Sequence, residues 1–112
     1  MADDPLTHDP CQPCRDTSCR LDSEQTGELL SRLSGWRRVG STAIEKEFAF
    51  AGYPATMAFV NIVAWLAERE DHHPDLEVGY DRVTVRFTTH AVGGLSRNDF
   101  ICAAKIDALV RI

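Results

Sequence analysis

Apolar residues recur at helical spacing in three parts of the chain. The first part begins where Asp22 or Ser23 can cap a helix and carries leucines three and four residues apart. The second covers residues 54–71, with proline in its first turn and apolar side chains on more than one face. The third starts at a capping box formed by Ser96 and Asp99. We therefore expect three helices, and the broad apolar surface of the second indicates an oligomer.

Alternating apolar and polar residues between these helices predict strands. One strand is expected over residues 36–50, with room for another between residues 43 and 53. Two shorter alternating runs, 76–80 and 83–89, flank a turn and predict a hairpin. The expected order of elements is therefore helix, strand, helix, two strands, helix.

Composition changes this picture at the N-terminus. Residues 1–21 are rich in Asp, Pro, Cys, Thr and Arg and contain almost no large apolar side chains, so burial cannot offset the entropy of ordering them. The chain as a whole has 112 residues, 44% of them hydrophobic, which suits one modest core. We expect a flexible, Cys-containing extension over residues 1–21 and one folded domain over residues 22–112.

Charge and hydropathy narrow the classes of partner. Lys and Arg total 12 against 17 for Asp and Glu, a net charge of -5 that disfavours nucleic acid and anionic membrane surfaces. The longest apolar stretch, residues 55–67, is interrupted by Asn61 and is shorter than the roughly 20 residues that a membrane span needs. Because residues 1–9 resemble neither a signal nor a transit peptide, we expect a cytoplasmic protein.

Four cysteines are too few for a disulfide framework and fit a reducing compartment. Cys11 and Cys14 form a CxxC pair with Cys19 nearby, which is compatible with zinc or with a disulfide. Only His8 offers a fourth ligand within the extension, and the pair does not stand at a strand-helix junction. An unligated extension is therefore the favoured interpretation.

Three histidines lie beside breaks in the predicted elements. His72 and His73 stand at a helix end, and His90 stands where a strand meets a Gly-rich loop. Imidazole titrates near pH 6.5, so such side chains can serve as general acid and base if they meet in one cleft. The alternative is that His72 and His73 only cap the last helical carbonyls. Zinc is disfavoured because adjacent histidines point in different directions.

Three further side chains have both a functional and a structural interpretation. Glu68 lies one helical turn before His72 and can hold its tautomer, or it can be a solvated carboxylate. Asp99 can bind a polar group or only cap its helix, and Trp36 can wall an aromatic ligand or belong to the core.

Residues 68–99 carry a family resemblance. Their sequence, EREDHHPDLEVGYDRVTVRFTTHAVGGLSRND, resembles the signature of the pterin-4a-carbinolamine dehydratases: an acid, His-His-Pro, Tyr, Val, Thr-His, and Gly-Leu-Ser ending on Asp. A looser likeness extends over residues 22–112, including the Gly35-Trp36 pair. The cysteine-bearing extension lies outside the core pattern and is similar to extensions of some bacterial members.

The resemblance implies a fold and an activity. The fold would be a single α+β domain, a four-stranded antiparallel sheet with three helices on one face, assembled as a homodimer or homotetramer. The reaction would be dehydration of a 4a-hydroxytetrahydropterin to the quinonoid dihydropterin, in pterin recycling, with neither metal nor redox cofactor. The implied catalytic residues are His72, His73, His90 and Glu68, and those around the pterin are Asp71, Thr88, Thr89, Trp36 and Asp99.

We expect His72 and His90 to exchange protons on opposite sides of the pterin, with Glu68 orienting His72 and His73 binding the ring. Two alternatives stay open. The first is a protein-interaction module, because animal members also resemble a dimerisation partner of a homeodomain transcription factor. The second is a pterin-binding role linked to molybdopterin metabolism, because some relatives with similar extensions look as though they serve it.

Overall fold

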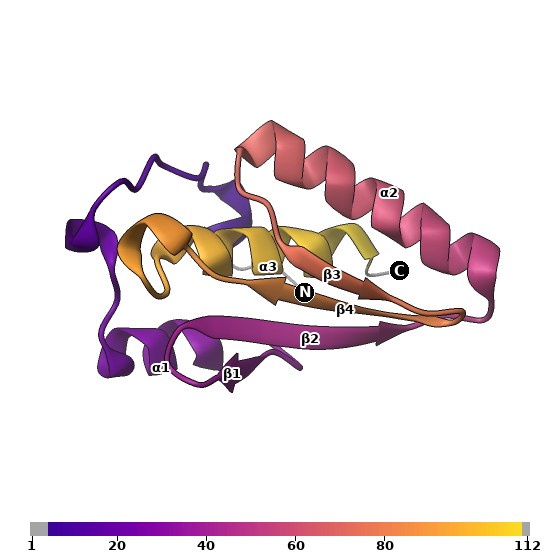
Figure 1. Ribbon diagram of the computed structural model, residues 1–112, viewed down its shortest axis with the longest axis horizontal. Helices are drawn as coiled ribbons and strands as arrows, with labels where there is room; N and C mark the ends of the chain where they lie inside the picture. Colours follow the sequence, from indigo (N-terminus) through magenta and orange to yellow (C-terminus); the bar gives the residue numbers. More distant parts are fainter. Residues whose placement is uncertain (1–4, 111–112) are drawn as a thin grey trace.

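One antiparallel sheet organises the computed structural model, which describes residues 5–110 (Figure 1). Its strands are β1 (Arg37–Val39), β2 (Ala43–Ala49), β3 (Asp75–Val78) and β4 (Arg82–Phe87), in the order β1-β2-β4-β3. The helices are α1 (Ser23–Ser31), α2 (Tyr53–Glu70) and α3 (Arg97–Val110), and three short 3-10 turns are η1 (Pro5–His8), η2 (Thr17–Cys19) and η3 (His90–Val92). The predicted α+β fold with three helices and four strands is confirmed. Residues 1–4 of the expected extension and 111–112 of the expected domain lie outside the described residues.

Local signals in the sequence account for the helix ends. Of the two candidate caps for α1, Asp22 is the one used: its side chain accepts from the Gln25 N–H at 2.8 Å, and Gln25 accepts from the Asp22 N–H at 2.9 Å. Pro54 lies in the first turn of α2, where its missing N–H costs nothing. Among residues 5–110, no helix has the length and apolar content needed to cross a membrane.

The segment predicted as one strand over residues 36–50 is a hairpin. β1 pairs with β2 in antiparallel register, Arg37 with Glu45 and Val39 with Ala43. Gly40 turns the chain with φ of 59°, a left-handed conformation that glycine adopts without steric cost. The further strand allowed for between residues 43 and 53 is β2, whereas the single strand over residues 36–50 was wrong, because the alternation was counted without this turn.

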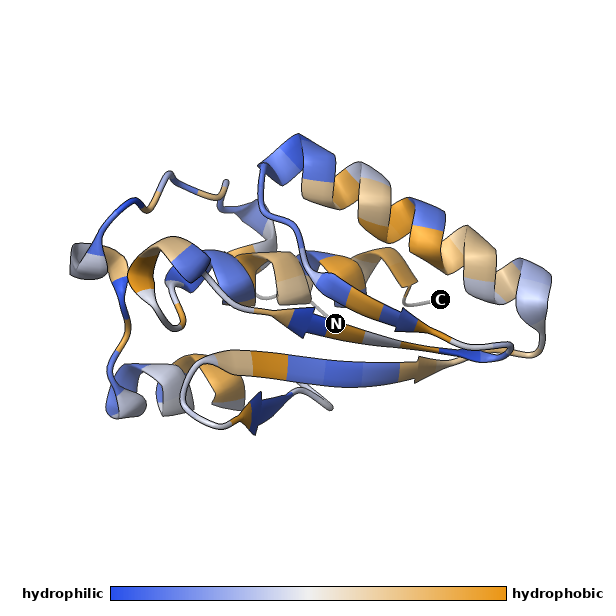
Figure 2. Cartoon of the chain, in the orientation of Figure 1, coloured by the Kyte–Doolittle hydropathy of each residue, from blue (hydrophilic) through white to orange (hydrophobic). Residues whose placement is uncertain are grey.

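The core lies between one face of the sheet and the helices. Figure 2 shows polar and apolar residues alternating along β3 and β4, as expected when one strand face is buried. The buried side chains of the sheet are Ile44, Phe48, Val83, Val85 and Phe87, and those of the helices include Leu29, Phe59, Val63, Leu66, Phe100, Ile101 and Ile106. Burial of these aliphatic and aromatic groups is the main force that holds the three helices on the sheet.

Residues 5–21 pack against the domain in the structure. Leu6 in η1 is fully buried in the core cluster, and η1 lies against α3. Asp9 pairs with Arg97 of α3 at 3.2 Å, and the Leu21 N–H donates to the Leu95 carbonyl at 2.8 Å. The expected flexibility followed from the scarcity of large apolar side chains, yet one of the few present, Leu6, docks the segment.

Candidate active site

The C-terminal end of α2 directs His72 towards α3. Asp71 caps the helix in a left-handed conformation, φ 52° and ψ 42°, and the His72 N–H donates to the Ala67 carbonyl at 3.1 Å. The imidazole stacks parallel on Phe87 of β4, with ring centroids 5.7 Å apart and an interplanar angle of 7°. The side chain is 12% exposed, so His72 is packed in place yet open to one side.

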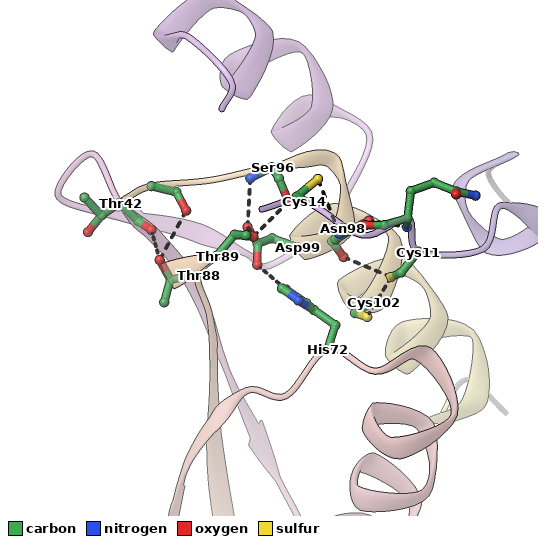
Figure 3. A network of polar contacts seen from close by, with 12 residues as sticks. Cys11, Cys14, Thr42, His72, Thr88, Thr89, Ser96, Asn98, Asp99 and Cys102 are labelled. Carbon is green, nitrogen blue, oxygen red and sulfur yellow. Dashed lines mark hydrogen bonds and ion pairs between the residues drawn. The ribbon is translucent and has the colours of Figure 1, made fainter. Parts of the chain in front are cut away.

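Asp99 is the partner of His72. Its carboxylate is fully buried, and Oδ1 lies 2.6 Å from His72 Nε2 (Figure 3). Oδ2 accepts from the Thr89 hydroxyl at 2.8 Å and from the Ser96 N–H at 3.0 Å. The Ser96 hydroxyl, 2.8 Å from Thr89 Oγ1, then donates to Thr89, whose own proton is already used. Asp99 therefore caps α3 and holds an imidazole at once, so the functional and the structural interpretation are both met.

This geometry selects the tautomer of His72. An ionised carboxylate only accepts hydrogen bonds, so Nε2 must carry the proton that points at Asp99. Nδ1 is then the ring nitrogen left to exchange a proton with a ligand. A buried carboxylate behind an imidazole also stabilises the imidazolium that forms when the ring accepts a proton. The pair has the chemistry of a general base.

Glu68 binds the other histidine. Its Oε1 lies 3.0 Å from His73 Nε2, and both side chains are largely exposed. The prediction that Glu68 orients His72 is therefore wrong in this structure. The helix ends at Glu70, and the left-handed Asp71 turns the chain before His72, so the i,i+4 relation of a continuous helix does not apply.

The structure brings only some of the other predicted residues to this pair. Asp71 and Thr89 lie beside His72, while His90 opens η3 and is exposed to solvent. The Thr88 hydroxyl donates to the carbonyl of Thr42, on the loop before β2, and lies 3.3 Å from the Gly94 carbonyl.

Trp36 belongs to the core and not to a ligand wall. It is 6% exposed, its Nε1 donates to Asp107 at 3.0 Å, and its ring packs against Phe48 and Phe87. The structural alternative given for this residue is the one observed. Trp36 supports the site only from behind, since Phe87 also carries the stacked imidazole of His72.

A cavity of about 260 Å³ opens beside His72. This volume is close to the lower end of the range for small-molecule sites, about 300–1,000 Å³. Its lining residues are Cys11, Gln12, Pro13, Cys14, Arg15, Glu70, Asp71, His72, Thr89 and Asn98. Among residues 5–110, no three His, Cys, Asp or Glu side chains come together in a way that could hold a metal ion.

Sequence reasoning missed Glu70, Asn98 and residues 11–15 as parts of this cavity. The backbone N–H of Cys11 donates to Glu70, and that of Gln12 to Asn98, across 59 and 86 residues of chain. No local pattern marks such pairs. The one sequence signal in this segment was the CxxC spacing of Cys11 and Cys14. It was considered for zinc binding or a disulfide, not as part of a ligand cavity.

Comparison with known proteins points to one family. A family model described as pterin 4 alpha carbinolamine dehydratase matches residues 19–109. A relative from Nitrosospira multiformis, provisionally named a pterin-4-alpha-carbinolamine dehydratase, is 54% identical over 109 residues, covering 97% of this chain and 96% of its own. A similarly named relative from Nitrosomonas europaea is 50% identical over 107 residues, covering 95% of this chain and 94% of its own.

Two solved structures are similar to this chain in fold and in sequence. A transcriptional coactivator/pterin dehydratase from Brucella melitensis superposes with a TM-score of 0.79 and 34% identity, over 82% of this chain and 99% of its own. A pterin dehydratase-like protein described as a RuBisCO assembly factor in the alpha-carboxysome gives a TM-score of 0.57 and 30% identity, over 67% and 88%. The family match over most of the chain and the two relatives of at least 50% identity lead to one conclusion: this chain belongs to the pterin 4 alpha carbinolamine dehydratase family.

Proposed function

We propose that the chain dehydrates a 4a-hydroxytetrahydropterin to the quinonoid dihydropterin. The observation that carries the proposal is the buried Asp99 carboxylate 2.6 Å from His72, at the wall of a ligand-sized cavity. Loss of water from the 4a carbon needs one proton delivered to the departing hydroxyl and one removed from the neighbouring ring nitrogen. No electrons are exchanged with a second reactant, so an acid and a base are the groups that the reaction requires.

We assign proton removal to His72. Asp99 holds the Nε2–H, which leaves Nδ1 free to take the proton from the ring nitrogen while the nitrogen lone pair forms the new double bond. The carbon-oxygen bond breaks, and the hydroxyl leaves as water after His90 protonates it. Both histidines return to their starting states by exchange with solvent.

The remaining polar residues take supporting roles in this proposal. His73, which pairs with Glu68 and follows His72 in the chain, is assigned contact with the exposed edge of the pterin ring. Asp71 and Thr89 line the cavity and offer oxygen atoms to the amino and amide groups of a pterin. Thr88 fixes the loops around the site through its hydrogen bonds to backbone carbonyls.

The direct test is the decay of chemically generated 4a-hydroxytetrahydropterin with and without the protein. We expect the wild-type chain to accelerate it, and His72→Ala and His90→Ala each to lower kcat by about 10²-fold or more. His8→Ala is the matched control, because this exposed histidine lies in η1 outside the cavity lining. Wild-type rates in both variants would rule out the assigned acid-base pair.

A second candidate function is protein interaction, favoured by apolar side chains left exposed on and beside α2. Trp65 is 57% exposed, and Tyr53 stacks on the exposed Tyr80 with centroids 6.2 Å apart. Of the two solved relatives, one is described as a transcriptional coactivator/pterin dehydratase and the other as a RuBisCO assembly factor, and both descriptions include a role in protein interaction. Capture of a defined partner that survives His72→Ala and is lost in Trp65→Ala would support this function.

We also propose that α2 mediates assembly into a homodimer or homotetramer, and that the chain works in the cytoplasm. The same exposed Trp65 and Ile62 are the groups that self-association would cover. Sedimentation analysis of the wild type and Trp65→Ala tests the first point, since a wild-type monomer would contradict it. Fractionation of the producing cells tests the second.

A further inference from the structure

Five consecutive residues of the N-terminal segment form part of the cavity wall. Residues 11–15, which we call the strap, line the cavity together with His72, Asp71 and Thr89. The strap lies outside the stretch matched by the family model, residues 19–109. The match to the Nitrosospira multiformis relative covers 97% of this chain, which leaves too few residues unmatched to exclude the strap. The strap is therefore an addition to the family domain that this relative shares.

Asn98 holds the strap by its backbone. The Gln12 N–H donates to Asn98 Oδ1 at 2.9 Å, and Asn98 Nδ2 donates to the Gln12 carbonyl at 2.6 Å. Asn98 Nδ2 also lies 3.8 Å from Cys14 Sγ, and Asn98 is only 7% exposed. A side-chain amide that pairs with both backbone groups of one residue fixes position and direction, as a strand partner does. The next residue along α3 is Asp99, so adjacent side chains hold the strap and the imidazole (Figure 3).

A second anchor joins the strap to the end of α2. The Cys11 N–H donates to Glu70 Oε1 at 3.0 Å, and Glu70 Oε2 pairs with Lys105 at 2.9 Å. Burial acts to raise the pKa of Glu70, but the hydrogen bond from Cys11 and the Lys105 ammonium outweigh it and lower the pKa. The carboxylate therefore stays ionised and keeps accepting from the strap near neutral pH.

The thiol of Cys11 reinforces this anchor. Its Sγ lies 3.5 Å from the fully buried Cys102 Sγ and 3.8 Å from the Asn98 carbonyl. The hydrogen bond with Cys11, followed by burial, raises the pKa of Cys102, so Cys102 stays a neutral thiol that packs against Cys11. Leu6, fully buried, fixes the chain just before the strap.

We propose that the strap is the wall that closes the ligand site over His72, so that a pterin bound against His72 also contacts residues 11–15. The inference rests on the proposed function for the identity of the ligand. Closure by the strap excludes water from the proton-transfer site, and it adds ligand contacts that the family domain alone does not provide. Asn98 is then a positioning residue that acts on the ligand site through the strap.

The wall can be tested without any ligand by carbethoxylation of the full chain with diethyl pyrocarbonate. Tandem mass spectrometry gives the ratio of His72 to His73 modification, and the exposed His73 serves as internal reference. We expect Asn98→Ala to raise this ratio at least about threefold, because loss of two hydrogen bonds shifts the strap towards its released state. Asn61→Ala, which changes an exposed asparagine on α2, is the matched control and should leave the ratio unchanged.

A second variant separates the strap from effects on α3. Gln12→Pro removes the Gln12 N–H, which donates to Asn98 Oδ1, and changes no residue of α3. It should raise the ratio in the same direction as Asn98→Ala. An unchanged ratio in both folded variants would overturn the proposal.

Equilibrium dialysis with 7,8-dihydrobiopterin tests the ligand contact. We expect Kd to rise at least about threefold in Asn98→Ala and Gln12→Pro, and to stay at the wild-type value in Asn61→Ala. A raised carbethoxylation ratio with unchanged Kd would overturn the claim that the ligand touches the strap. If the wild type does not bind the pterin, the proposed function fails, whereas a raised ratio would still support the strap as the cover of His72.

Discussion

Replacement of Asp99 by Asn should move the ring proton of His72 from Nε2 to Nδ1 without removing the cap of α3. The amide oxygen of the substituted side chain can still accept from the Ser96 N–H and the Thr89 hydroxyl, which are 3.0 Å and 2.8 Å from Oδ2 in the wild type. The amide nitrogen then faces His72 Nε2, 2.6 Å from the replaced Oδ1. Two donors cannot face each other, so the ring must carry its proton on Nδ1.

The magnitudes follow from these contacts. Each hydrogen bond to a charged group contributes about 1.5–3 kcal/mol and each neutral one about 0.5–1.5 kcal/mol, so the three exchanged bonds lower the free energy of unfolding by about 3 kcal/mol. This is less than the total of about 5–15 kcal/mol for a typical domain, so the variant should fold. The proton on Nδ1 blocks the base, and kcat should fall by about 10²- to 10⁴-fold, the usual contribution of general acid-base catalysis; the equivalent exchange in a serine protease triad lies at the upper end, about 10⁴-fold.

Two measurements check this reasoning. Imidazole ¹⁵N-¹H correlation spectra at alkaline pH should show the His72 proton on Nε2 in the wild type and on Nδ1 in Asp99→Asn. The dehydration assay should show the loss of kcat, with KM nearly unchanged. Asp75→Asn on β3, where the carboxylate is exposed, is the control for loss of one negative charge. A folded Asp99→Asn chain that keeps wild-type turnover or the Nε2 proton would refute the argument.

Two further predictions concern groups outside the proton transfer. Hydrogen bonds from Arg37 and then Arg86 lower the pKa of Glu45 below its ordinary 4.5; its stabilising effect is therefore full above pH 4.5 and is lost as pH falls through the lowered value. Urea unfolding should show Glu45→Gln less stable than wild type at pH 7, with the difference shrinking in acid; a gap independent of pH would contradict this. Burial and the hydrogen bond with Cys19 raise the pKa of Cys14 to about 11, so about one thiol in a thousand is ionised at pH 8. Native alkylation of Cys14 by iodoacetamide should be slow at pH 8 and accelerate towards pH 11, and labelling at pH 8 as fast as in urea would disprove the shift.

The elements with strong periodicity were predictable from the sequence. Residues 54–71 predict α2 almost to its ends, because proline marks its start and Pro74 excludes His73 from the helix. The hairpin of β3 and β4 follows from strict alternation, which sets Leu76 opposite Val85 and Val78 opposite Val83. The turn between β1 and β2 was not predicted, because it depends on a single left-handed glycine, Gly40.

Of the residues named from the sequence, the structure brings His72, Asp99, Asp71 and Thr89 together, but their pairing was not predicted. Helical spacing predicted that Glu68 pairs with His72. The left-handed Asp71 ends the helix before His72, and His72 instead pairs with Asp99, 27 residues later. Such a pairing depends on how α2 and α3 pack, which no local pattern encodes. The docking of the strap was not predicted for the same reason, since Asn98 lies 86 residues after its partner Gln12.

The double use of Asp99 ties the inheritance of the fold to the inheritance of the site. One carboxylate begins α3 through Ser96 and aligns His72, so selection for a sound helix start also preserves an aligned imidazole. A lineage that abandoned the chemistry and kept only the scaffold, for instance as a binding protein, would retain this acid for its capping role alone. The presence of Asp99 therefore does not distinguish enzymes from binding proteins among such descendants. The presence of His72, the histidine that Asp99 faces, is the informative feature.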